Sequence, residues 1–151
     1  MSQTQTDTLS PGQQRTLACV AALMIPASAE FGVPGADDPL ILADMLKSLG
    51  RDGPAVREAL ARLDALAGGH FTDLARARQE EVAGAFRAEG GVPLASLSRL
   101  VLQCYYRDDR VMRSLNMEAR PPFPKGHEVE QGDWSLLDPV RKRAKMWRDA
   151  P

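Results

Sequence analysis

Apolar residues recur at helical spacing along the first 117 residues, and residues that start or stop helices separate these stretches. The first stretch opens at Ser10–Pro11, where serine suits the cap and proline the first helical position, and it ends before Pro26. Asp38–Pro39 marks a second start, with Gly50 as its stop. The inward faces predicted for these two helices consist of Leu17, Val20, Ala21, Met24 and Ile25, and of Leu40, Leu42, Ala43, Leu46 and Leu49.

Two further helices follow in the same manner. Gly53–Pro54 opens a third helix that stops at Gly68–Gly69. A fourth begins at about Thr72 or Leu74 and is closed by Gly90–Gly91, because glycine readily adopts the backbone conformation that ends a helix. The residues expected to face inward from the third helix are Val56, Leu60, Leu63 and Leu66.

A fifth helix is predicted to start at Pro93, and a short turn follows at 109–115. Tyr105 and Tyr106 are adjacent, so only one of them is expected to face the core. Alternating strand patterns are missing, and Ala, Leu, Arg and Glu favour helix. We therefore predict an all-α fold of about five helices in a small bundle over 10–117, with an inward face on the fifth helix of Leu94, Leu97, Leu100, Val101, Cys104 and Tyr105.

The two ends of the chain have a different composition. Residues 1–9 are polar and are expected to be disordered. Residues 118–151 contain RPPFPKG, two tryptophans and a basic run, with little helical periodicity. We predict a long irregular arm that packs on a partner, on the protein's own core, or on both.

The bulk composition limits the possible functions. The chain has 151 residues, enough for one domain without disulfides or metals. Its 19 basic and 20 acidic residues give a net charge of −1, which argues against nucleic acid as the main partner. Cys19 and Cys104 lack the spacing of a metal or redox motif. Either they stay reduced, or they form one bridge between packed helices.

No export or membrane signal is recognised in the sequence. The first 15 residues lack the basic and apolar regions of a signal peptide. The longest apolar run, LACVAALMIPA, is short and contains Pro26. We expect a cytoplasmic protein without direct membrane insertion, although export with a partner that carries a signal remains open.

Candidate chemistry is sparse. His70 and His127 are the only histidines, and neither has a partner at ligand spacing. The acidic pairs Asp37–Asp38 and Asp108–Asp109 stand where helices begin, so helix capping is their expected role. We predict no catalytic, cofactor-binding or metal-binding residue in this chain, and hence no enzyme.

The order of the segments resembles a known family. LSPGQQRTLACVAALMIPA is followed by GGHFTDLARARQEEVAGAF, then by LVLQCYYRDDRVMRSLNM, and finally by RPPFPKG and a late tryptophan. Together these segments are similar to the gluconate 2-dehydrogenase subunit 3 family, from about Ser10 to Trp147. The similarity lies in the order of loose motifs, and the chain lacks the twin-arginine segment that exported members carry.

The resemblance implies a non-catalytic small subunit that stabilises a large FAD-dependent oxidoreductase subunit of the glucose-methanol-choline type, which acts on a sugar or an alcohol. FAD would then belong to the partner, and a cytochrome subunit remains an open question. The alternative is a free-standing helical regulator that binds DNA through its basic C-terminal segment. Interface hot spots favour aromatic residues and arginine. The residues predicted to contact the partner are Tyr106, Phe123, Pro124, Trp134, Leu137, Arg141 and Trp147.

Overall fold

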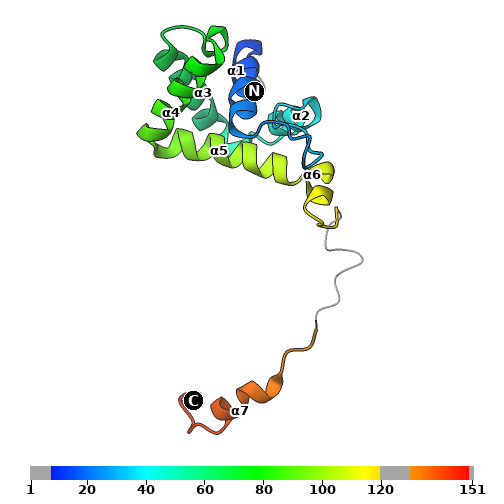
Figure 1. Ribbon diagram of the computed structural model, residues 1–151. Coiled ribbons are helices and arrows are strands. Elements are labelled where there is room, and N and C mark those ends of the chain that lie inside the picture. Colours follow the sequence, from blue (N-terminus) through cyan, green and yellow to red (C-terminus); the bar gives the residue numbers. More distant parts are fainter. Residues whose placement is uncertain (1–7, 120–129, 150–151) are drawn as a thin grey trace, which may run out of the picture. The chain divides into compact units, whose positions relative to one another are not determined.

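The computed structural model describes residues 8–119 and 130–149 (Figure 1). Residue contacts divide the chain into two units, Met1–Ala119 and Arg120–Pro151, and each is described by itself. Regular structure in both described ranges is helical, which confirms the all-α prediction. Seven α-helices are present in these ranges, two more than the predicted five.

Helix α1 (Pro11–Met24) begins and ends where the sequence predicts. The Ser10 hydroxyl accepts a hydrogen bond from the Gln13 amide, and the Gln13 side chain accepts one from the Ser10 amide. This reciprocal capping box satisfies two amides that have no partner inside the helix. Helix α2 (Pro39–Lys47) is capped by Asp38, which accepts from the Leu40 amide at 2.9 Å.

The inward face of α2 differs from the prediction. Leu40 is 68% exposed, whereas Ile41 and Met45 are buried. Residues four apart share one helix face, and Leu49 continues the same face beyond the helix end. Of the predicted face, Leu40 and Ala43 are exposed, Leu42 and Leu46 are partly buried against the core, and Leu49 is buried as predicted. Ile41 and Met45 were missed, because a run of apolar residues offers two adjacent faces and packing buries one of them more deeply.

A short 3₁₀ turn η1 (Gly50–Asp52) leads into α3 (Gly53–Ala67). Helix α3 ends at Gly68, whose φ of 72° lies in the left-handed region that favours glycine. Its amide donates to the Ala65 carbonyl oxygen. The predicted start, stop and buried face of this helix, including Val56, Leu60 and Leu63, are confirmed.

The starts of the next two helices were misplaced by the sequence prediction. A 3₁₀ turn η2 (Phe71–Asp73) precedes α4 (Arg76–Glu89). The buried Phe71 donates its amide proton to Asp64 Oδ1 at 2.9 Å, which holds this segment outside the helix. Helix α5 (Gly91–Tyr106) starts two residues before Pro93, because a proline in the first turn removes no intrahelical hydrogen bond.

The core of the first unit is built around α3 and α5. Helix α3 packs against α1, α4 and α5, and α5 also packs against α2 (Figure 1). Helix α6 (Asp109–Ser114) completes this unit next to the end of α5. The largest fully buried apolar side chains are Phe71, Leu17, Ile41, Met45, Leu60, Leu63 and Leu97.

The second unit contains two short consecutive helical turns. These are the 3₁₀ turn η3 (Trp134–Leu137) and α7 (Asp138–Arg141). The arm predicted to be irregular therefore contains two short ordered turns. Asp133 caps η3 and Pro139 lies in the first turn of α7, and both residues are typical of helix starts.

Candidate functional site

The described part of the C-terminal unit has no core of its own. Every residue from 130 to 149 is exposed. Trp134 is 61% exposed and Trp147 is 71% exposed, although tryptophan is usually well buried in folded proteins. The other large apolar side chains exposed in this unit are Leu136, Leu137, Val140 and Met146.

Helical geometry brings three of the predicted contact residues together. Trp134 and Leu137 are three apart in a 3₁₀ turn, where such residues lie on the same face. Arg141 follows Leu137 by four residues, at α-helical spacing. Trp134, Leu137 and Arg141 therefore follow one side of two consecutive turns, in the way that anchors of a groove-binding helix are arranged.

Local hydrogen bonds fix the start of this segment. Asp133 Oδ1 accepts from the Ser135 hydroxyl at 2.6 Å and from the Ser135 amide at 3.0 Å. Both hydrogen bonds lower the pKa of the Asp133 carboxyl group, and the bond from the Ser135 hydroxyl has the larger effect. Trp134 donates from Nε1 to Gln131 Oε1 at 3.1 Å, which leaves the indole ring available to solvent.

The described basic side chains of the second unit make only exposed contacts. Lys145 Nζ lies 5.9 Å from the centroid of a Trp147 ring and also pairs with Asp149. Arg141 pairs with Asp138 at 3.4 Å. Such exposed pairs contribute little to stability, so these charges remain available for a partner.

The remaining predicted contact residues lie elsewhere. Tyr106 belongs to α5 of the first unit and is 52% exposed, whereas Tyr105 is buried, as expected for adjacent helical positions. Their rings meet edge to face at 5.2 Å. Phe123 and Pro124 lie outside the described residues.

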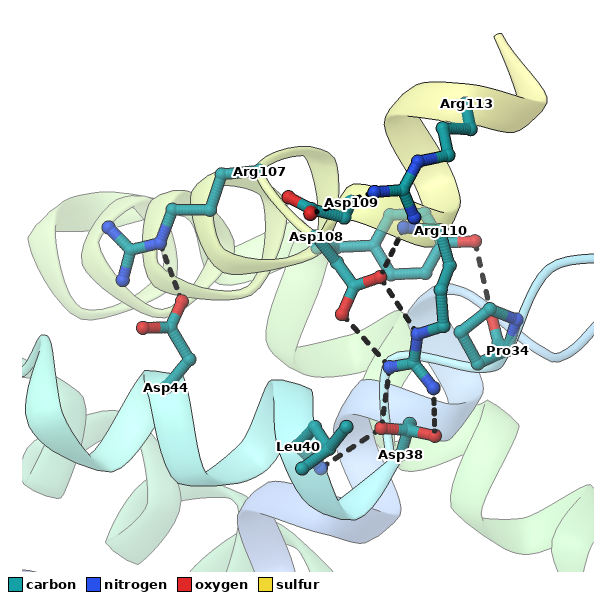
Figure 2. Close-up of polar contacts among 10 residues, drawn as sticks. Pro34, Asp38, Leu40, Asp44, Arg107, Asp108, Asp109, Arg110 and Arg113 are labelled. Carbon is teal, nitrogen blue, oxygen red and sulfur yellow. Dashed lines mark hydrogen bonds and ion pairs between the residues drawn. The ribbon is translucent and has the colours of Figure 1, made fainter. Parts of the chain in front are cut away.

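A cluster of ion pairs lies just beyond the end of α5, between the starts of α2 and α6 (Figure 2). Arg110 donates to both carboxylate oxygens of Asp38, at 2.8 and 3.0 Å, and to both oxygens of Asp108 at 2.9 Å. Each carboxylate also caps a helix, as predicted. Tyr105 donates its hydroxyl proton to the Pro34 carbonyl oxygen at 3.2 Å.

We call Arg110, Asp38 and Asp108 the Arg110 clamp. Hydrogen bonds from Arg110 lower the pKa of both carboxyl groups, because they favour the ionised form. The clamp thereby joins the first turns of α2 and α6. The clamp fixes the backbone at the starts of these two helices. Its three charged groups already form ion pairs with one another.

Reactive groups do not converge in the described residues. Cys19 and Cys104 are free thiols, and burial raises the pKa of each, which favours the unreactive protonated form. His70 is exposed beside η2, and His127 lies outside the described ranges. No group of three or more His, Cys, Asp or Glu residues within these ranges could hold a metal ion.

A groove between α1, α4 and α5 was not anticipated from the sequence. It has a volume of about 510 Å³, and we call it the α1/α4/α5 groove. The one signal for it in the sequence is the glycine of VAGAF, placed inside a predicted helix. The residues that line it are Val20, Leu23, Met24, Glu80, Ala83, Gly84, Phe86, Arg87, Leu94, Leu97 and Ser98.

Comparisons with known proteins give no further assignment. No family model matches the chain, and no match is found among curated proteins or solved structures. None of the helices in 8–119 and 130–149 is both long and apolar enough to cross a bilayer. The resemblance described above therefore depends on the order of the quoted segments alone.

Proposed function

We propose that this chain is a non-catalytic small subunit that binds and stabilises a large FAD-dependent sugar or alcohol oxidoreductase subunit. The observation that carries the proposal is the exposure of Trp134, Leu137 and Trp147 in a unit whose described residues have no core. Exposed aromatic residues next to arginine are typical of binding hot spots. The identity of the partner comes from the family resemblance.

The proposed mechanism is the burial of apolar surface on the large subunit. Trp134 and Leu137 would enter an apolar depression of the partner, and Arg141 would lie at its edge. The Asp133 cap and Pro139 in the first turn of α7 already restrict this segment, which reduces the entropy lost on docking. The flavin and the reaction then belong to the large subunit, and this chain keeps that subunit soluble.

The test is co-expression of this chain with the glucose-methanol-choline-type flavoprotein encoded nearest to it. We expect the soluble, FAD-loaded yield of the large subunit to fall at least tenfold when this chain is omitted. Trp134→Ala is expected to weaken the complex by about 30-fold, equivalent to about 2 kcal/mol. Phe31→Ala is the matched control, because Phe31 is an equally exposed aromatic residue of the first unit, outside the arm.

An unchanged yield without this chain would contradict the proposed function. If the soluble complex tolerates Trp134→Ala as well as Phe31→Ala, the proposed partner would stand. The proposal that the C-terminal arm contacts this partner would then be wrong.

A further inference from the structure

Gly84 occupies an unusual position in the first unit. It lies in the interior of α4 and is exposed at the α1/α4/α5 groove. Glycine in a helix interior is destabilising relative to alanine. A Cβ added at Gly84 would meet no atom within 4 Å, and Gly84 is not among the residues with positive φ. Neither the backbone nor a neighbour in the described residues therefore requires glycine here.

Glycine also serves where a second backbone must approach a helix closely. Small residues at a helix surface reduce the distance between helix axes, which depends on the side chains at the contact. Ala83 precedes Gly84 and also lines the groove. These two small residues of α4 line the groove together with Leu23 and Met24 of α1.

The groove is suited to a helix rather than to a small molecule. Its floor includes the buried Val20, Phe86 and Leu97. Met24 on its edge is 37% exposed and Gly84 is exposed, so the groove is open to solvent. Small-molecule sites bury most of the ligand surface, whereas an amphipathic helix buries one apolar face and leaves the other in water.

The charge at the edge of the groove indicates which charge its occupant carries there. Glu80 is already paired with Arg76 at 2.9 Å. Arg87, seven residues further along α4, has no ion pair or hydrogen-bond partner in the described residues. The uncompensated charge is therefore positive, and a carboxylate at the edge of the occupant complements it.

We propose that the α1/α4/α5 groove receives an amphipathic helix of the large flavoprotein subunit. The helix crosses α4 at Gly84 with a small residue of its own and places a carboxylate beside Arg87. This inference rests on the proposed function, and it adds a second contact surface to the one formed by Trp134 and Leu137.

The experiment compares three variants of the full chain, each co-expressed with the same flavoprotein and titrated as a purified complex. Gly84→Leu fills the groove, and we expect it to weaken binding at least 30-fold. Ala85→Leu is the matched control, since Ala85 is exposed on the same helix and does not line the groove. We expect this control to change affinity by less than threefold.

Gly84→Ala separates folding from docking. Alanine favours helix, and its Cβ meets nothing, so the melting temperature of the free chain is expected to rise by a few degrees. Affinity is expected to fall about threefold to tenfold in the same variant. A rise in stability with a loss of affinity is a combination that misfolding does not produce.

Two outcomes would overturn the inference, and they are distinguishable. If Gly84→Leu and Ala85→Leu bind equally well, the complex exists but the groove does not receive the helix. If the wild-type chain forms no complex, the proposed function fails together with the inference. Loss of binding with Gly84→Leu alone, together with the opposed effects of Gly84→Ala, supports it.

Discussion

The two units of this chain use their apolar residues in opposite ways. In the first unit, Phe71 and Leu63 are fully buried and pack among helices. In the second, Trp134 and Trp147 are more than half exposed; Trp134 belongs to a short helical turn, and Trp147 lies outside any helix. Isolated turns of this length are not stable through propensity alone. The comparison teaches that apolar content by itself does not distinguish a buried core from an exposed segment; the surrounding periodicity does.

The difference predicts opposite mutational responses in the free chain. Phe71→Ala removes a buried ring and is expected to lower the free energy of unfolding by about 3–5 kcal/mol. Trp134→Ala removes an exposed ring and is expected to change it by less than about 0.5 kcal/mol. Urea denaturation of both variants, followed by circular dichroism, measures the two values.

This measurement also decides between the alternatives left open for the arm. A loss of 2 kcal/mol or more with Trp134→Ala would show that the tryptophan packs on the protein's own core. The contrast between the two units would then disappear.

A smaller effect is expected at the Arg110 clamp. The Arg110 side chain is 38% exposed, and exposed ion pairs are strongly screened. Arg110→Met is therefore expected to cost only about 1 kcal/mol of unfolding free energy, measured by urea denaturation at pH 7. Arg113→Met is the matched control, because Arg113 pairs with Asp109 at the surface of the same helix.

The clamp also has a defined pH dependence. The pKa values of Asp38 and Asp108 are lowered from 3.8 in the folded protein. Their contribution is therefore present above the unfolded pKa and is lost as the pH falls through the folded value. Between pH 5 and pH 2, Arg110→Met should flatten the decline in stability. A decline as steep as that of the wild type would contradict the ion-pair geometry.

The smallest effect is expected from the basic residues of the second unit. Replacing Lys142 and Arg143 by glutamine should slow association with the flavoprotein by about threefold and leave dissociation unchanged, because charges at an interface edge act mainly on association. Stopped-flow measurements at two salt concentrations test this. Tight binding of DNA that weakens steeply with salt would instead favour the DNA-binding alternative.

Local signals in the sequence were sufficient to predict several helix boundaries. Ser10–Pro11, Asp38–Pro39 and Gly68 each act through atoms within a few residues, and the structure confirms all three. Helix α4 was misplaced because Asp64 binds the Phe71 amide from seven residues away. Such a contact depends on tertiary packing and leaves no local pattern.

The candidate site was only partly accessible from the sequence. Exposed aromatic residues could be proposed because Trp134 and Trp147 lie outside any apolar periodicity. The Arg110 clamp could not be predicted from the sequence, since Arg110 and Asp38 are 72 residues apart. The groove required the relative placement of three helices, and only the glycine at position 84 hinted at it.

The central claim is that this chain is the accessory subunit of a flavoprotein. The most direct measurement is size-exclusion chromatography after co-expression with that flavoprotein, with an affinity tag on this chain alone. We predict a yellow, stoichiometric complex in which the flavin absorbance co-elutes with the tagged chain. A tagged chain that elutes alone, colourless and monomeric, would contradict the claim.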